Sequence, residues 1–454
     1  MTLLVQTGKM AYHCIMKQKL LFISHMAGLS GGGEKSLLQI VLSLKAKDYL
    51  CHVILPGEGE FSKRLSVEGI SHTVLTYKWS EYIPDDGYDP NREENMALHI
   101  ANTMIDFERA IIDIKPDIVI TNTIVAPWGM YIAKAHGLPG ILLVREWLFG
   151  EDEMKMVPDN NQYIQMAAMC SDKVIFNSKD LMEKYREYFL HSDTSVMYPD
   201  VGLSETTIKE HYRDNTIGTN PSILIAGVIA PHKNQIEAVR GIRIALDLGM
   251  NIGDILIIGK SGDPDYYQAL SGVISECGLT EMIKVREYAD DFYYILNEYN
   301  IVLVPSKAEP FGRITLEAQL FGRVVIGSNS GGTSELIVDR ETGLLYNYGD
   351  VYGLANTLKW VADNTDEAEK IGETAKVQQM KRFVGKDLLN PLEESINELL
   401  TASANHERDR SFDPLFAAMS KIAKQEEEIE GIRNSHAFKI GNAAVTPLRK
   451  LKER

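Results

Sequence analysis

Short aliphatic runs that alternate with longer amphipathic stretches are the feature that most constrains the fold of this chain. Parallel strands need a long crossover between them, and that crossover is usually a helix. The alternation therefore predicts βα units that wind parallel sheets. The expected strands form an N-terminal series at 20–24, 52–56, 72–77, 117–123, 141–146, 173–178 and 196–199, and a C-terminal series at 222–227, 254–259, 283–287, 301–306, 324–329 and 343–347.

A polar segment rich in Thr and Glu separates the two series and ends at Pro221. Such a segment is typical of a link between domains. We therefore expect an α/β protein with two Rossmann-like domains, whose parallel sheets face each other across a cleft. The predicted parts are a leader at 1–18, a first domain at 19–201, a linker at 202–220, a second domain at 221–385, a helix at 386–405 that packs back on the first domain, and a basic helical tail at 406–454.

Composition narrows the classes of function. The formal charge of −16 argues against binding to nucleic acid, which needs clustered Lys and Arg. The four cysteines form no CxxC pair, so neither a disulfide framework nor a zinc site is expected. No stretch approaches the roughly 18 consecutive apolar residues that cross a bilayer. These features favour a cytoplasmic protein.

The segment EPFGRITLEA, from Glu309 to Ala318, carries the strongest chemical pattern and directly follows the expected strand at 301–306. If a helix begins near Gly312, Glu317 projects from its second turn while Glu309 lies in the preceding loop. Both carboxylates can then converge on one ligand at the carboxyl end of the strand. The helix N-terminus offers N–H groups to a phosphate.

This segment resembles the EX7E motif of glycosyltransferase family 4, also called glycosyl transferases group 1. Two further segments are similar to the family in order and spacing, namely IAGVIAPHKNQIEAVRGI at 225–242 and GGTSELIVDRETGLLY at 331–346. The resemblance implies a GT-B fold. It also implies transfer of a sugar, with retained anomeric configuration, from a nucleotide-diphosphate donor to a carbohydrate or lipid-linked acceptor. Neither a metal nor a cofactor is then expected.

The resemblance also implies roles for individual residues. Glu317 would hold the donor ribose hydroxyls, since an ionised carboxylate accepts two hydrogen bonds at once. Glu309 would face the hydroxyls of the donor sugar, and the backbone amides around Phe311 and Gly312 would line the sugar and the diphosphate. Lys233 would neutralise the charge that develops on the leaving phosphate.

One departure concerns a phosphate-binding cation. The family commonly has Arg immediately after the glycine that is Gly227 here, whereas this chain has Val228. We hypothesise that Arg313, at the start of the helix after Gly312, supplies the missing charge. Contacts with the nucleotide base are expected from the loop backbone around Tyr288.

The segment SHMAGLSGGGEKS resembles the glycine-rich donor loop of the family, in which Gly31, Gly32 and Gly33 would let the backbone approach the diphosphate. The same letters nearly form a Walker A loop, but Glu34 stands between Gly33 and Lys35 where that loop requires its lysine. A nicotinamide oxidoreductase is also disfavoured, because no GxGxxG follows a strand with an acid about 20 residues later.

The residue of the first domain that reaches the donor sugar is open. The family often has a His there, whereas the equivalent position here carries Arg145 and Glu146, which could contact donor or acceptor. His25, at the end of the first strand, is the other candidate. The DxD formed by Asp263 and Asp265 could hold a metal, but an acid beside Pro264 better fits a helix start.

The carboxyl-terminal segment IRNSHAFKIGNAAVTPLRKLK is similar to tails of bacterial transferases that build surface polysaccharides. A basic amphipathic end can rest on an anionic membrane surface, so peripheral association with the inner membrane face is one expectation, and a dimer contact is another. Two other functions stay open. One is a GT-B-shaped epimerase or isomerase of nucleotide-sugars, and the other is a catalytically silent protein that binds nucleotide-sugar.

Overall fold

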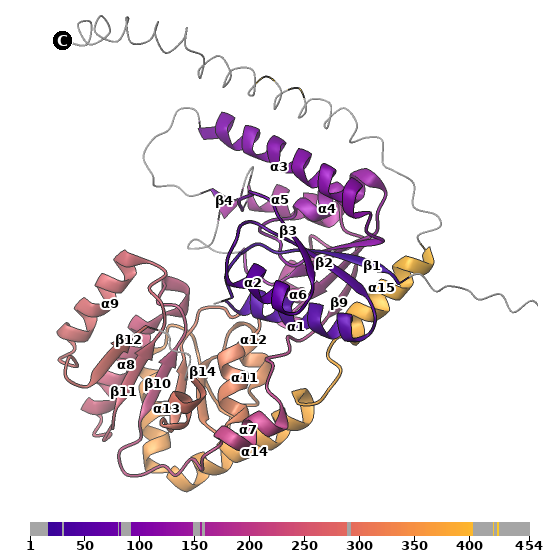
Figure 1. Cartoon of the computed structure of the whole chain (residues 1–454). Coiled ribbons are helices and arrows are strands. Elements are labelled where there is room, and N and C mark those ends of the chain that lie inside the picture. Colours follow the sequence, from indigo (N-terminus) through magenta and orange to yellow (C-terminus); the bar gives the residue numbers. More distant parts are fainter. Residues whose placement is uncertain are drawn as a thin grey trace, which may run out of the picture.

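A computed structural model describes residues 17–29, 31–79, 81–82, 92–148, 155–156, 159–287 and 292–402, together with Lys421 and Gln425. Two parallel sheets, each flanked by helices, form two domains in this part of the chain (Figure 1). The loop around Tyr288, nearly all of the predicted leader and nearly all of the predicted basic tail lie outside the described residues.

The first domain contains a seven-stranded sheet with the order β3-β2-β1-β5-β6-β8-β9. Its strands are parallel, and most are buried on both faces, which explains why they read as continuous aliphatic runs. They are β1 (Lys19–Ile23), β2 (Leu50–Leu55), β3 (Ser71–Val74), β5 (Ile118–Thr121), β6 (Gly140–Val144), β8 (Lys173–Phe176) and β9 (Asp193–Val196). The last strand ends at Val196, where the sequence predicts its beginning.

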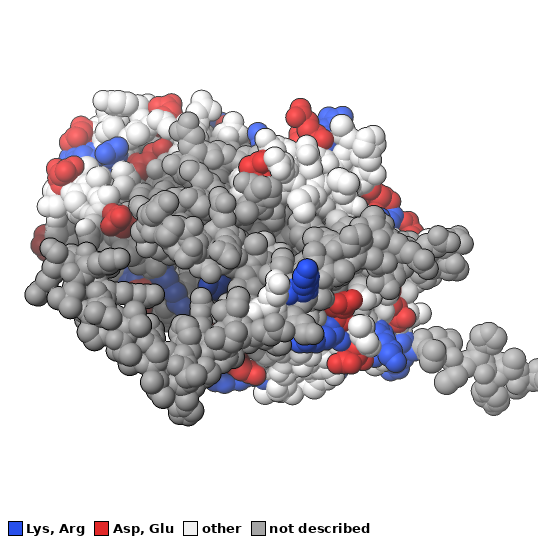
Figure 2. All heavy atoms as spheres, turned by 90° about the horizontal axis from the view of Figure 1, so that it is seen from above, with Lys and Arg blue, Asp and Glu red and all other residues white. Residues whose placement is uncertain are grey.

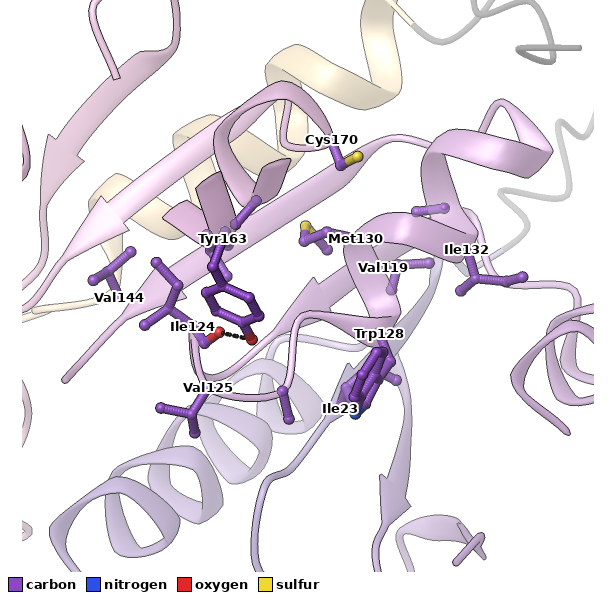
Figure 3. Packing of buried hydrophobic residues seen from close by; sticks show 14 of the residues in the cluster. Ile23, Val119, Ile124, Val125, Trp128, Met130, Ile132, Val144, Tyr163 and Cys170 are labelled. Carbon is purple, nitrogen blue, oxygen red and sulfur yellow. Dashed lines mark hydrogen bonds between the residues drawn. The ribbon is translucent and has the colours of Figure 1, made fainter. Parts of the chain in front are cut away.

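Helices α1 to α6 flank this sheet, and a short antiparallel pair of strands lies beside it. The helices are α1 (Gly32–Ala46), α2 (Glu60–Val67), α3 (Arg92–Ile114), α4 (Trp128–His136), α5 (Asn160–Met169) and α6 (Lys179–Tyr185), and the pair is β4 (Glu81–Tyr82) with β7 (Lys155–Met156). One face of the sheet packs against Trp128 and Tyr163 (Figure 3). The buried Tyr163 hydroxyl donates to the Ile124 carbonyl at 2.7 Å, so this polar atom is satisfied within the core.

The second domain contains a six-stranded parallel sheet with the order β12-β11-β10-β13-β14-β15. Its strands are β10 (Ile223–Ala226), β11 (Ile255–Ile258), β12 (Ile283–Arg286), β13 (Ile301–Val304), β14 (Val324–Ser328) and β15 (Leu344–Tyr346). Its helices are α8 (Gln235–Asp247), α9 (Pro264–Glu276), α10 (Phe292–Asn297), α11 (Arg313–Leu320), α12 (Gly331–Leu336), α13 (Val351–Asp363) and α14 (Thr365–Phe383). Both sheets thus reverse their strand order next to the first strand, and such a switch point is where open α/β sheets bind ligands.

The segment after β9 is not extended throughout. It forms helix α7 (Glu205–His211), whose first turn is capped by Ser204 accepting from the Thr207 N–H at 3.0 Å. Leu203 and Ile208 are buried in the core of the second domain. The predicted linker at 202–220 therefore packs largely as part of the second domain.

Helix α15 (Asn390–Ala402) returns from the second domain to the first (Figure 1). It packs on β5 and β8 and buries Leu392, Ile396 and Leu399 in the core under the first sheet. Lys47 pairs with Asp387 and Glu393 around the start of this helix. The chain consequently crosses twice between the domains.

Replacing Ile396 by alanine is expected to destabilise the first domain by about 2–4 kcal/mol, because the side chain is fully buried and its loss leaves a cavity. Urea unfolding followed by circular dichroism measures the shift. Asn397→Ala, on the exposed face of the same helix, is the matched control and should change little. Equal midpoints for the two variants would contradict the packing of α15 on the first domain.

Acidic and basic side chains are interspersed over the described part of the face drawn in Figure 2, without a continuous basic patch there. Among the described helices, none has the length and apolar character needed to cross a membrane.

Candidate functional site

The acidic motif lies at the carboxyl end of β13, where a loop leads into α11. Gly312 precedes the helix with a φ of 93°, a left-handed conformation that glycine adopts readily. Glu317 therefore points from the second turn of α11, and Glu309 lies in the loop before it. Both carboxylates are largely buried, with side-chain exposures of 13% for Glu309 and 8% for Glu317. The Phe311 ring packs into the core against Tyr198. This packing holds the acidic loop against the core.

Lys233 and Glu309 meet although they are far apart in sequence. Lys233 ends a 3-10 turn (Pro231–Lys233) after β10, and its Nζ lies 2.6 Å from Glu309 Oε1. Ser306 Oγ donates to the same oxygen at 2.6 Å. Burial alone would raise the pKa of Glu309, but Lys233 and Ser306 outweigh it and hold that pKa below its ordinary value. Glu309 is thus an ionised carboxylate beside a cation.

Gly227 lies next to the Lys233 side chain. Its φ of 141° is strained for other residues, and a Cβ there would come 3.9 Å from the Lys233 stem. Val228, which follows Gly227, packs toward Gly262 in the loop before α9. In that loop Asp263 accepts the Tyr266 N–H at 2.9 Å, and Pro264 begins the helix, so this carboxylate serves as a helix cap.

The start of α12 presses against the acidic loop. Gly332 donates its N–H to the Glu309 carbonyl at 2.6 Å, and a Cβ on Gly332 would lie 2.4 Å from the Phe311 carbonyl oxygen. Only glycine fits this approach, because the neighbouring atoms belong to the backbone. The GGTSEL segment therefore supports the position of Glu309.

Gly332→Ala is expected to displace this loop, with a loss of about 1–3 kcal/mol in stability from overpacking and at least about tenfold in activity from misplacement of Glu309. Gly272→Ala is a matched control, since an added Cβ there meets nothing within 4 Å and Gly272 lies inside α9. Thermal unfolding and a nucleotide-release assay measure both effects. A Gly332→Ala protein with normal stability and activity would contradict this role for α12.

Arg313 connects Glu317 to the first domain. Its Nη2 lies 3.4 Å from Glu317 Oε1, and the same guanidinium donates to the carbonyls of Asp200 and Val201 at 3.4 Å each. A Cβ on Gly32 would lie 2.8 Å from the Arg313 Cδ, so the glycine loop of the first domain touches α11. Burial raises the pKa of Glu317, with Arg313 and Lys35 acting in the opposite direction.

The glycine loop leads into α1, whose N-cap Gly31 provides no side-chain cap. Glu34 in the first turn is buried, and its Oε1 lies 3.1 Å from His25 Nε2. Burial favours the neutral acid, but the contact with His25 outweighs it and lowers the pKa of Glu34. A Cβ on Gly33 would come 3.1 Å from His25 Cε1. His25 therefore lies under the glycine loop, next to the point where the two domains touch.

Arg145 and Glu146 follow β6 but have different surroundings. Glu146 accepts the Thr123 hydroxyl at 2.7 Å and the Ile124 N–H at 3.1 Å, which fixes the turn after β5. Arg145 donates through Nε to Asn122 Oδ1 at 2.9 Å. Its Nη1 donates to Ser36 Oγ on α1 at 3.1 Å. The partners Asn122 and Ser36 were missed by the sequence analysis, because no local pattern marks them.

Glu335 is a third residue that the sequence analysis missed. Its carboxylate on α12 accepts the Lys179 N–H at the start of α6, at 2.8 and 3.0 Å, and Tyr198 donates to it at 3.3 Å. These bonds join the second domain to the first.

The predicted site residues thus form two groups. Lys233 and Glu309 are in direct contact at the start of the acidic loop, and Glu317 with Arg313 meets Gly32 at the domain contact. A cavity of about 280 Å³ lies elsewhere, between α1 and the two segments that cross between the domains, and it is lined by residues such as Gln39, Ser43, Pro199 and Leu388. None of the predicted donor-site residues lines it.

The sequence profile of the family described as Glycosyl transferases group 1 matches residues 207–378, which run from within α7 to within α14 and include both carboxylates and Lys233. Residues 207–378 form a glycosyl transferases group 1 domain. The segment before residue 207 lies outside this match.

Curated relatives of the group 1 domain share limited identity with the chain. It is 23% identical over 217 residues to the capsular polysaccharide biosynthesis glycosyltransferase CapM of Staphylococcus aureus, covering 47% of this chain and 55% of that protein. It is 26% identical over 165 residues to the 2-deoxystreptamine N-acetyl-D-glucosaminyltransferase of Niallia circulans, covering 36% and 41%. The chain thus spans about half the length of these two relatives.

The structural likeness extends beyond the group 1 domain to the first domain. The crystal structure of Anabaena Alr3699/HepE in complex with UDP and glucose matches with a TM-score of 0.62 and 20% identity, covering 84% of this chain and 99% of that protein. At this identity the match establishes the fold alone. The two Rossmann-like domains therefore have the GT-B arrangement.

Proposed function

We propose that this protein is a glycosyltransferase that moves a sugar from a nucleotide-diphosphate-sugar to a carbohydrate or lipid-linked acceptor. The observation that carries the proposal is the contact of Lys233 Nζ with Glu309 at 2.6 Å, at the carboxyl end of the β13 strand that leads to the buried Glu317. A cation and two buried acids at this edge of the sheet suit an activated sugar with a charged leaving group.

In this proposal each of the three side chains contacts a different part of the donor. Glu317 would accept hydrogen bonds from the ribose hydroxyls, and Glu309 would accept them from the hydroxyls of the sugar. The Lys233 ammonium, held beside Glu309, would contact the β-phosphate. Because Ser306 also donates to Glu309, that carboxylate keeps a hydrogen-bond partner when the lysine turns toward the phosphate.

The proposed transfer proceeds with retention and without a metal. The bond between the anomeric carbon and the phosphate oxygen breaks, and its electron pair stays on that oxygen. The acceptor hydroxyl forms the new bond on the same face of the sugar and gives its proton to the departing phosphate. Negative charge grows on the phosphate in the transition state, so a fixed ammonium lowers the barrier more than it strengthens ground-state binding.

Two similarities guide the choice of substrates to test. The Anabaena protein of the same fold was solved with UDP and glucose, which makes UDP-sugars the first donors to try. The Staphylococcus aureus relative is named for capsular polysaccharide biosynthesis, which supports a role in surface polysaccharide synthesis. Such a role fits a cytoplasmic location, with the predicted tail at 406–454 resting on the inner membrane face.

A donor panel tests the proposal. UDP-, GDP- and other nucleotide-sugars are incubated with and without a mixture of glycan and lipid-linked acceptors, and release of the free nucleoside diphosphate is measured. Acceptor-dependent release is the expected result. Conversion of a donor to an isomeric nucleotide-sugar without acceptor would identify an epimerase instead. Binding of a nucleotide-sugar without release or isomerisation would indicate a catalytically silent protein.

A further inference from the structure

The carboxyl edge of the first sheet holds a buried arginine with spare hydrogen-bonding capacity. Arg145 follows β6, Asn122 follows β5, and the two lie beside the switch point between β1 and β5, where a doubly wound sheet opens toward ligands. Arg145 is 9% exposed. Its Nη2 has no hydrogen-bond partner among the described residues, and no described carboxylate forms an ion pair with it.

Desolvation disfavours the charged form of a buried guanidinium that makes no direct ion pair. Burial and the nearby Arg313 lower the pKa of Arg145 to about 10, although Glu146 and Glu34 act against this shift. Arg323 differs from Arg145 in the hydrogen bonds of its guanidinium group. Arg323 is buried as well, with 1% exposure, and burial likewise lowers its pKa to about 10. Its guanidinium, however, donates to four backbone carbonyls, those of Phe321, Asn297, Tyr299 and Arg213. Arg323 is satisfied within the fold, whereas Arg145 is not.

The glycine loop lies next to Arg145. Arg145 holds Ser36 on α1 and Asn122, and the Asn122 amide donates to the Gly33 carbonyl at 3.3 Å. Arg313 reaches the same loop from the second domain, against Gly32. The nearest acid in the loop, Glu34, is held by His25 at 3.1 Å and does not pair with Arg145. Two arginines, one from each domain, therefore contact the first residues of α1, which has no side-chain cap.

We propose that Arg145 binds an oxygen of the second phosphate of the donor diphosphate at the glycine loop, and so supplies from the first domain a positive charge that Val228 does not provide. This inference rests on the proposed function. The diphosphate would enter where Gly32 and Arg313 now touch. Separation of the two domains there would let it reach both Nη2 of Arg145 and the N–H groups at the start of α1.

Isothermal titration with UDP, GDP, their monophosphates and inorganic pyrophosphate tests this role. Arg145→Met should weaken binding of pyrophosphate and of the preferred diphosphate about 10- to 100-fold, as expected for loss of a charge-assisted hydrogen bond. Binding of the matching monophosphate should change less than about threefold, because the lost contact is to the second phosphate. Arg145→Lys should recover part of the affinity, since it keeps the charge.

Thermal unfolding separates this role from a structural one. Arg145→Met removes two hydrogen bonds, those to Asn122 and Ser36, so its unfolding midpoint should fall by less than that of a buried arginine with more partners. Arg323→Met, the matched buried-arginine control, strips four carbonyls of their donor and should unfold at a clearly lower temperature with unchanged nucleotide affinity per folded molecule.

The titrations and the unfolding measurements can uphold or overturn the role of Arg145. A folded Arg145→Met protein that binds diphosphate and pyrophosphate as tightly as the wild type overturns the inference, as does an equal loss for mono- and diphosphate. A wild type that binds neither probe also overturns it. A wild type that binds pyrophosphate through Arg145 but no nucleoside diphosphate upholds the anion site and contradicts the proposed function instead.

Discussion

Replacing Lys233 by alanine is expected to lower turnover about 100- to 1000-fold, the range found when a fixed donor to a developing negative charge is removed. The lysine forms an ion pair with the acidic loop, with its Nζ 2.6 Å from Glu309, and the proposed leaving group is a phosphate. The effect should fall mainly on kcat, because the phosphate gains charge as the bond breaks. Release of nucleoside diphosphate under saturating donor measures it.

Two further variants test whether the loss of turnover depends on the positive charge at position 233. Lys233→Arg keeps the positive charge and should recover part of the lost turnover. Lys370→Ala removes an exposed lysine on α14 of the same domain and should leave turnover within about twofold. If Lys233→Ala turns over donor at the wild-type rate, the proposed role of the lysine at the leaving phosphate is wrong.

Replacing Glu317 by glutamine should weaken binding of the preferred nucleoside diphosphate about 10- to 100-fold, because an amide cannot accept from both ribose hydroxyls as a carboxylate does. The change is nearly isosteric, so the buried site keeps its shape. Titration with the nucleotide and with its 2′,3′-dideoxy analogue gives the test. The variant should bind both ligands about equally, whereas the wild type should prefer the ribonucleotide. If the variant still prefers the ribonucleotide, the ribose does not bind at Glu317.

The pH dependence of nucleotide binding gives a second readout of Glu317. Its pKa is raised above 4.5 by burial, so the carboxylate becomes protonated, and loses its capacity to accept two hydrogen bonds, while the pH is still above that value. Affinity should therefore fall as the pH drops through the raised pKa. Because Arg313 lowers this pKa, Arg313→Met should move the loss of affinity to higher pH. An identical pH profile for the variant would contradict the coupling of the two residues.

The pKa of Glu309 is shifted in the opposite direction from that of Glu317. Its pKa is depressed in the folded protein, so its ion pair with Lys233 stabilises the fold above pH 4.5. That contribution is lost as the pH falls through the depressed value. The two carboxylates of one motif are therefore distinguishable by titration.

The sheets and the start of α11 were predictable because their causes are local. A parallel strand buried on both faces must be aliphatic along its length, as β5 is, and Gly312 must precede the helix because the chain takes a left-handed turn there. The recognition of the family and its GT-B fold from the segments at 225–242, 309–318 and 331–346 is confirmed by the family match and the similar structures.

The connections between the domains were less predictable, since they depend on how distant surfaces meet. Glu335 binds the Lys179 N–H across 156 positions of sequence, and Arg313 reaches the Asp200 carbonyl across 113. The spare capacity of Arg145 likewise depends on Asn122 and Ser36, which come from two other elements of the first domain. The roles assigned to individual site residues remain predictions.

A crystal structure of the protein soaked with the nucleoside diphosphate that binds best in the panel would locate the donor site. We expect a ribose bonded to Glu317 and a diphosphate contacted by Lys233 between the two domains. A nucleotide bound elsewhere, for example in the cavity behind α1 near Gln39, with Lys233 still paired to Glu309 and Glu317 untouched, would contradict this expectation.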